Sequence, residues 1–215
     1  MKRLALFVSG GGSNFRAIHQ AVLDGVIDGV VGLVVTDKIE CPAAAYAREH
    51  AIELYPYPVA GQTPANLVKA LNDGAIDFLI LAGYLKMVPV EVVRAYPRKI
   101  LNIHPALLPD FGGPGFYGRR VHEAVLASGA EISGATVHFV DAQYDHGPTV
   151  AQVTVPVEPE DTPATLAARV LEQEHRLYSQ VVAALCRGAI DWEDGTPHLE
   201  PPLTLPNLYK TRDPL

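Results

Sequence analysis

The stretch Leu4-Ala5-Leu6-Phe7-Val8-Ser9-Gly10-Gly11-Gly12-Ser13-Asn14 begins with a short apolar run and ends in three glycines and two small polar residues. An apolar run bounded by glycine is typical of a buried strand. The next residues, Phe15 to Leu23, have the apolar spacing of a helix. A glycine turn between a strand and a helix directs backbone N–H groups to a place where the helix dipole favours an anion. The stretch therefore predicts a strand, turn and helix, with the turn acting either as a tight connection or as an anion site.

The same alternation of short apolar runs and helical patterns continues through the first half of the chain. Further strands are expected at Val30 to Thr36, Phe78 to Ala82 and Ile100 to Ile103, and helices near Ala43 to His50 and Val90 to Tyr96. Such alternation produces a parallel sheet with helices on both faces. Two β-rich runs, 134–140 and 149–157, then predict an antiparallel pair. The expected fold class is α/β, with a Rossmann-like, doubly wound, mostly parallel sheet and an antiparallel extension.

The last long helix has the clearest end signals in the chain. Asp161 or Thr162 can serve as its N-cap, and Gly188 follows its last apolar positions. Beyond this glycine the sequence becomes proline-rich and loses its periodicity. We expect one domain over residues 1–188, with residues 189–215 as a C-terminal tail packed on the same domain.

The composition restricts the possible partners and compartments. The 17 basic and 24 acidic residues give a net charge of −7, which disfavours broad binding to nucleic acid or to an anionic membrane. Cys41 and Cys186 form no CxxC motif, as expected of buried thiols in a reducing compartment. The first apolar run is too short for a signal peptide, and none approaches the roughly 20 residues that span a bilayer. These features predict a soluble, cytoplasmic protein.

A second informative stretch is Asn102-Ile103-His104-Pro105-Ala106-Leu107-Leu108-Pro109, which follows an apolar run. In an extended strand, residues i and i+2 point to the same side, so Asn102 and His104 can converge on one group. Open α/β sheets bind ligands at this end of their strands. An amide and a protonated imidazole can both donate to an oxygen that becomes negative during acyl transfer. The alternative is an ordinary structural histidine.

Two further patterns have more than one interpretation. An imidazole needs a nearby carboxylate to be largely cationic at neutral pH, and Asp145 is the candidate. The density of His138, Asp141, Asp145 and His146 also suggests a metal site, but the spacing matches no metal motif, and we expect no metal. Glu174 lies on the apolar stripe of the last helix, where its carboxylate either faces a polar cleft or extends to solvent from the edge of the stripe.

Three stretches in sequence order carry a resemblance to a known family. They are the opening run 8–14, the stretch 102–109, and Ser133-Gly134-Ala135-Thr136-Val137-His138-Phe139-Val140 followed by Tyr144-Asp145-His146-Gly147-Pro148. From Arg3 to Gly188 the chain resembles the phosphoribosylglycinamide formyltransferases, which are folate-dependent formyltransferases of purine biosynthesis. The resemblance implies the formyltransferase fold and transfer of the formyl group of 10-formyltetrahydrofolate, a cosubstrate, to the amino group of 5'-phosphoribosylglycinamide. It implies small-molecule substrates, no metal cofactor, no nucleic acid or membrane partner, and a monomer or homodimer.

The resemblance also implies roles for individual residues. Asn102, His104 and Asp145 are implied to be catalytic, with Asp145 orienting and charging the histidine and His138 supporting them. The phosphate is implied to bind at Gly12, Ser13 and Asn14, and the ribose hydroxyls at Glu174. The implied folate-binding residues are Leu85, Lys86, Met87, Val88, Asn102, Val140 and Asp141. Simple core packing is the alternative for at least one of Leu85, Met87 and Val88.

The chain departs from the family pattern at two places, and there are three alternative functions. The glycine-rich run Phe111 to Arg120 is longer than is common in the family and is expected to be a lid, and an arginine near the folate tail has no counterpart around 62–64. The main alternative is 10-formyltetrahydrofolate hydrolase, which shares the Asn, His and Asp but uses water, and which typically carries an N-terminal regulatory domain. Methionyl-tRNA formyltransferase would need a C-terminal RNA-binding domain and a basic surface. A non-catalytic nucleotide-binding module is disfavoured by the intact catalytic residues.

Overall fold

The chain forms two compact units in its computed structural model, which describes residues 1–205 and 207–209. The first unit comprises Met1–Asn102 and Val140–Ala142. The second comprises Ile103–Phe139 and the described residues from Gln143 onward.

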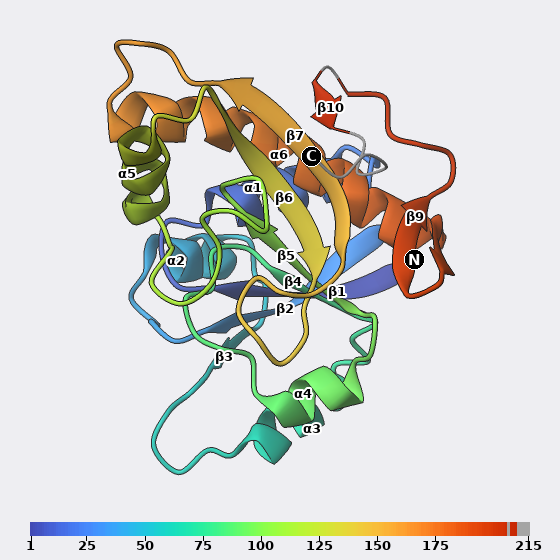
Figure 1. Cartoon of the computed structure of the whole chain (residues 1–215). Coiled ribbons are helices and arrows are strands. Elements are labelled where there is room, and N and C mark those ends of the chain that lie inside the picture. Colours follow the sequence, from blue (N-terminus) through green and yellow to red (C-terminus); the bar gives the residue numbers. More distant parts are fainter. Residues whose placement is uncertain (206, 210–215) are drawn as a thin grey trace. The chain divides into compact units, whose positions relative to one another are not determined.

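The first unit consists of alternating strands and helices (Figure 1). Its elements are β1 (Lys2–Val8), α1 (Ser13–Leu23), β2 (Gly29–Thr36), α2 (Pro42–Glu49), β3 (Leu54–Pro56), α3 (Pro64–Asp73), β4 (Phe78–Leu81), α4 (Val90–Ala95) and the beginning of β5 (Ile100–His104). The strands pair in the order β3-β2-β1-β4-β5, and every pairing is parallel. The side chains of residues 4–8 in β1 are fully buried, as expected for the central strand of a sheet covered on both faces. The βα alternation expected from the sequence is confirmed.

Strand β3 and helix α3 were not predicted from the sequence. Local signals for α3 exist, however, because Thr63 and Asn66 form a capping box and Pro64 occupies the first turn. Leu67 and Leu71, one helical turn apart, are fully buried. The helix packs against α4, beside which it lies in Figure 1.

The second unit is built on an antiparallel strand pair, β6 (Ile132–Phe139) and β7 (Thr149–Pro156). The long helix α6 (Pro163–Arg187) packs on both strands, and α5 (Arg119–Ser128) packs on α6, as Figure 1 shows. The antiparallel pair expected from the sequence is confirmed, whereas α5 was not predicted.

The ends of α6 agree with the sequence signals. Of the two N-cap candidates, Thr162 occupies the position, and its hydroxyl accepts a hydrogen bond from the Thr165 N–H at 3.2 Å. Gly188 is the C-cap with φ 70°, a left-handed conformation that glycine adopts without a Cβ clash. Eleven residues of the helix are buried, and Glu174 is one of them.

The residues after α6 form short strands in the second unit. The hairpin of β8 (Ile190–Glu193) and β9 (Thr196–Leu199) is followed by β10 (Leu208–Tyr209), which pairs with β7. The Trp192 ring lies 4.8 Å from the Phe139 ring, centroid to centroid. The division into a domain of residues 1–188 and a tail of residues 189–215 stays a prediction. Among the described helices, none is long and apolar enough to cross a membrane.

Candidate active site

The glycine turn after β1 has a geometry that its glycines make possible. Gly12 is the N-cap of α1 with φ 73°, and a Cβ added to it would lie 2.6 Å from the Cβ of Ala43. Both the backbone angle and the close packing of α2 therefore require glycine. A Cβ added to Gly10 or Gly11 would meet no atom within 4 Å. The turn thus leaves open space beside its backbone, next to the first N–H groups of α1, which have no intrahelical acceptor.

A serine that the sequence analysis did not single out connects this turn to the segment after β4. Ser9 is 2% exposed. Its N–H donates to the carbonyl of Gly83 at 3.1 Å, and its Oγ accepts from the Leu85 N–H at 2.9 Å. The predicted phosphate turn and the predicted folate segment are therefore fixed to each other inside the first unit.

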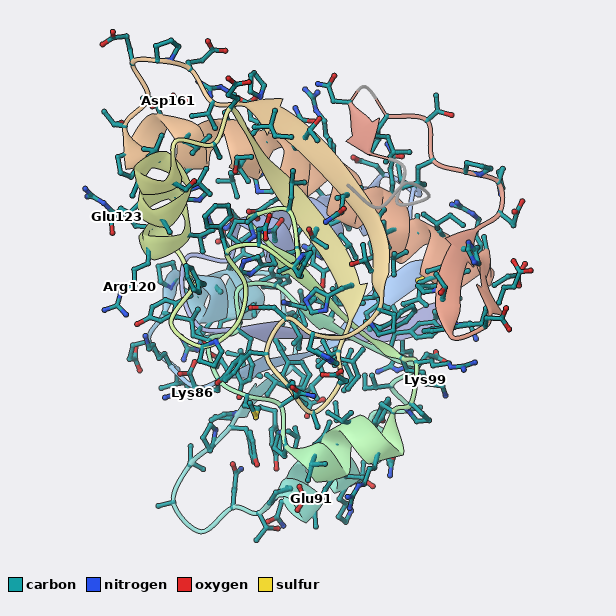
Figure 2. All side chains as sticks on the ribbon, viewed as in Figure 1. Lys86, Glu91, Lys99, Arg120, Glu123 and Asp161 are labelled. Atoms are coloured by element: carbon teal, nitrogen blue, oxygen red, sulfur yellow. The ribbon has the colours of Figure 1, made fainter. Side chains whose placement is uncertain are left out.

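The predicted folate segment after β4 divides into exposed and buried residues. Leu85 and Met87 are 46% and 47% exposed, and Lys86, labelled in Figure 2, is also exposed. Val88 is 5% exposed and belongs to a core cluster of the first unit. Core packing, the alternative interpretation, thus describes Val88, whereas the other apolar side chains offer accessible surface.

The second predicted folate segment lies in the same unit. Val140 packs against the cluster that contains Val88, and its N–H donates to the Ile100 carbonyl at 3.0 Å. Asp141 is half-buried. Val140 and Val88 therefore share one apolar cluster, while the contacts of these residues with folate stay a prediction.

Strand β5 carries the predicted amide and imidazole. Asn102 pairs with Leu81 of β4, and His104 is the last residue of the strand. Asn102 is half-buried and His104 is 4% exposed. Their i, i+2 spacing in a strand confirms the local geometry on which the sequence interpretation depended.

In the second unit, Asp145 lies between two histidines. Its Oδ2 is 3.5 Å from Nδ1 of His104, and its Oδ1 is 3.6 Å from Nε2 of His138. The Gly113 N–H donates to Oδ2 at 3.0 Å. The chain has φ 52° at Asp145, a left-handed conformation that aspartate tolerates better than most residues. The structure thus brings His104 and Asp145 together, as predicted, and places His138, the implied supporting residue, at the other carboxylate oxygen.

The register of β6 changes beside this cluster. Val137 pairs with Ala151, but His138 pairs with Thr149, so the pairing skips one residue of β7. Such bulges redirect a side chain at the end of a ladder. The nearby His146 is exposed.

The pKa of His104 lies below its ordinary value of 6.5. Burial is the largest cause, because it disfavours the charged imidazolium, while the Asp145 carboxylate and the Phe111 carbonyl raise the pKa by less. We therefore correct the expectation that Asp145 makes this imidazole largely cationic at neutral pH. In the free protein, the loss of solvation outweighs the neighbouring charge.

The pKa of Asp145 also lies below its ordinary value, although burial alone would raise it. The His138 imidazole, the charge of His104 and the Gly113 N–H together outweigh the burial. Asp145 is therefore a carboxylate at neutral pH. It can stabilise positive charge on either neighbouring imidazole.

The glycine-rich loop after β5 covers this cluster. The Phe111 carbonyl accepts a hydrogen bond from Nε2 of His104 at 2.8 Å. A Cβ added to Gly112 would collide with the side chain of Leu108 and lie 3.3 Å from the Cβ of Asp145. The loop expected to extend to Arg120 ends at Gly118 instead, because α5 begins at Arg119. A cavity of about 310 Å³ lies between residues 108–113 and 144–149, beside Asp145.

The remaining predicted site residues are buried or half-buried in their own units. Asn14 is 7% exposed on α1, and Ser13 is half-buried. Glu174 is 7% exposed on α6, which disfavours the alternative of a carboxylate extended into solvent.

Both cysteines are free and buried, as predicted. In the described part of the chain, no group of three or more His, Cys, Asp or Glu residues could hold a metal ion.

Comparison with known proteins identifies the class to which this fold and site belong. Residues 2–182 match the family model described as formyl transferase, and the chain belongs to this family. It is 53% identical over 206 residues to the chloroplastic phosphoribosylglycinamide formyltransferase of Arabidopsis thaliana, covering 93% of this chain and 70% of that protein. It is 33% identical over 190 residues to the phosphoribosylglycinamide formyltransferase of Bacillus subtilis (strain 168), covering 86% of this chain and 95% of that protein.

A solved structure confirms the fold class. The crystal structure of glycinamide ribonucleotide transformylase 1 from Symbiobacterium toebii matches with a TM-score of 0.84 and 33% identity, covering 93% of this chain and 94% of that chain. The α/β fold with a mostly parallel sheet and an antiparallel end, expected from the sequence, is therefore confirmed.

Proposed function

We propose that the protein transfers the formyl group of 10-formyltetrahydrofolate to the amino group of 5'-phosphoribosylglycinamide. The products are the formylated ribonucleotide and tetrahydrofolate, in purine biosynthesis. The observation that carries the proposal is the buried group of His104, Asp145 and His138 at the end of β5, in a chain whose close relatives bear this activity in their names.

The chemistry needs a stabilised oxyanion. The amine nitrogen attacks the formyl carbon, a new C–N bond forms, and the formyl oxygen becomes negative. Asn102 donates its amide N–H to that oxygen, and His104 donates its Nε2–H, which the Phe111 carbonyl accepts in the free protein. The bond between the formyl carbon and N10 of folate then breaks, and N10 takes up a proton as the amine loses one, directly or through water.

The charge state of His104 changes during this reaction. In the free protein, burial keeps its pKa low. The developing oxyanion adds a second negative charge beside the imidazole, in addition to the Asp145 carboxylate, and opposite charge favours the protonated form. Imidazolium is therefore favoured in the transition state more than at rest, which is the differential stabilisation that catalysis needs.

The substrates occupy separate parts of the proposed site. The phosphate binds at Gly12, Ser13 and Asn14, and the ribose hydroxyls bind Glu174. The pteridine ring binds along residues 85–88 and 140–141, with Asn102 at its reactive end. Two observations support this assignment: there is open space beside the backbone of Gly10 and Gly11, and the folate segment exposes apolar side chains.

One assay tests the function. Absorbance at a wavelength that distinguishes tetrahydrofolate from its formyl derivative is recorded with and without glycinamide ribonucleotide. We expect product only when the ribonucleotide is present. An equal rate in its absence would instead assign the chain to the hydrolases, and a lack of product in both cases would favour the non-catalytic module.

The oligomeric state and the compartment stay predictions. A monomer or homodimer is proposed, and light scattering after gel filtration distinguishes them. The cytoplasmic location was predicted from the sequence, whereas the Arabidopsis thaliana relative is named a chloroplastic protein. Cell fractionation with an antibody to the chain tests the location.

A further inference from the structure

The turn that follows His104 is held by two buried side chains from the antiparallel pair. Thr136 of β6 and Gln152 of β7 stand directly opposite each other in the ladder. Thr136 has no exposed surface and Gln152 is 4% exposed. Neither side chain was identified as a site residue from the sequence.

All the hydrogen-bonding capacity of the Thr136 hydroxyl is used. Its Oγ1 donates to the Ala106 carbonyl at 2.6 Å and accepts from the Leu108 N–H at 3.0 Å. It also accepts from Nε2 of Gln152 at 2.9 Å. A hydroxyl has one donor and two acceptor positions, so this group is saturated.

Gln152 completes the network. Its Nε2 donates to the Leu108 carbonyl at 2.9 Å as well as to Thr136 Oγ1. Both N–H groups of the amide are therefore used. Buried polar networks with every member satisfied are rigid, and removal of one member leaves costly unpaired groups.

The turn has no regular secondary structure of its own. It runs from Pro105 to Pro109, neither of which has a backbone N–H, and it contains no helix or strand. The turn connects His104, at its beginning, to Phe111, whose carbonyl binds the same imidazole. A displacement of the turn would therefore move both the imidazole and one of its acceptors.

We propose that Thr136 and Gln152 are positioning residues, which hold the 105–109 turn and thereby fix the His104 imidazole against Asp145 for the reaction. This inference rests on the proposed function for its effect on rate. Both side chains act through the backbone of the turn, and neither is assigned a contact with a substrate. Their loss is expected to reduce kcat and to leave the KM of each substrate within a few-fold of its original value.

The test uses the unmodified chain and four variants. Thr136→Val keeps the size of the side chain but loses the hydroxyl, Thr136→Ser keeps the hydroxyl, and Gln152→Met keeps the length without the amide. Ser133→Ala is the matched control, because Ser133 lies on the same strand, is 2% exposed, and has an Oγ without a hydrogen-bond partner among the described residues.

Thr136→Val and Gln152→Met should each lower kcat by about 10- to 100-fold, the usual effect of displacing a catalytic group by about 1 Å. Thr136→Ser should recover kcat to within about 3-fold of the original protein, and Ser133→Ala should leave it unchanged. The pKa of His104, followed by NMR, should fall in Thr136→Val because the imidazole loses its alignment with Asp145.

The following results decide whether Thr136 and Gln152 position His104. If Thr136→Val melts earlier but keeps its kcat and the His104 titration below its melting temperature, the network is only structural and the proposal is wrong. If Thr136→Val does not fold, Gln152→Met gives the same test, and Thr136→Ser and Ser133→Ala remain the controls that should keep their kcat. If the unmodified protein forms no formylated ribonucleotide, the proposed function fails, and the His104 titration in the variants still tests the positioning.

Discussion

At the residue scale, the pair of His104 and Asp145 gives the sharpest prediction. Asp145→Asn removes the negative charge that favours imidazolium, so the pKa of His104 should fall further below 6.5. The same change should lower kcat by roughly two to four orders of magnitude. NMR titration of the His104 ring and steady-state kinetics measure the two effects. An unchanged pKa would show that Asp145 does not support the charge.

Because His104 and Asp145 act as one unit, their losses should not add. His104→Ala should reduce kcat about as much as Asp145→Asn, and the double variant should be little worse than either single variant. Additive losses in a double-mutant cycle would indicate independent roles. The pairing distance of 3.5 Å is the observation that motivates this expectation.

Variants of two neighbouring glycines distinguish an effect on stability from an effect on phosphate binding. Gly12→Ala should destabilise the protein by about 1–3 kcal/mol, because the residue has φ 73° and its Cβ would approach Ala43. Gly11→Ala meets no protein atom within 4 Å, so it should leave the melting temperature nearly unchanged while raising the KM for the ribonucleotide more than that for folate. Equal changes in both KM values for Gly11→Ala would exclude a phosphate at this turn.

A variant of Glu174 tests whether this residue binds the ribose hydroxyls. Its carboxylate is nearly inaccessible on an otherwise apolar side of α6. Glu174→Gln should weaken ribonucleotide binding by about 1.5–3 kcal/mol, the usual value of hydrogen bonds to a charged group, with little effect on folate. Calorimetric titration with the ribonucleotide measures this difference, and an unchanged affinity would remove Glu174 from the site.

At the element scale, the N-terminus of α6 carries an ion pair that should make stability depend on pH. Asp161, labelled in Figure 2, accepts from Arg169 at 2.6 and 2.9 Å. The hydrogen bond from Arg169 is the main cause that holds the Asp161 pKa well below its ordinary value. A carboxyl with a lowered folded-state pKa stabilises the fold above its unfolded pKa of about 3.9, and this stability is lost as pH falls further.

The corresponding variant is Asp161→Asn. It should melt below the original protein at pH 7, and the difference should shrink as the pH falls below about 4. Thermal melts at several pH values give the comparison. Lys69→Met is a suitable control, since its ion pair with Asp73 is exposed at both ends and should contribute little.

Elements also show why some local structure was predicted and some was missed. The boundaries of α6 were predictable because an N-cap hydroxyl and a C-cap glycine act locally. In α5, the buried Val121 and Val125 and the left-handed Gly129 supplied a similar signal, but the glycine-rich run before it suggested that the loop continued to Arg120. The three-residue β3 is too short for its alternation to be recognised.

At the scale of the whole molecule, the charge balance predicts which partners are excluded. With 17 basic and 24 acidic residues, the protein should pass through a heparin column at about 0.15 M salt, where electrostatic attraction to a polyanion would otherwise retain it. The small ribonucleotide should still bind, because its phosphate needs only the local N–H groups of one turn. Retention on heparin would reveal a basic surface that the net charge conceals.

The sequence by itself determined the class of fold, the ends of α6, and the candidate amide, imidazole and carboxylate. The fold class, the ends of α6 and the pairing of Asn102 with His104 depend on periodicity, capping and i, i+2 spacing, which operate between near neighbours in the chain, whereas Asp145 was assigned through the family resemblance. Only the tertiary structure decided that burial keeps the His104 pKa low, that His138 faces the other oxygen of Asp145, and that Thr136 and Gln152 hold the turn after β5. Desolvation and contacts between residues far apart in sequence arise only when the chain packs, so no local pattern encodes them.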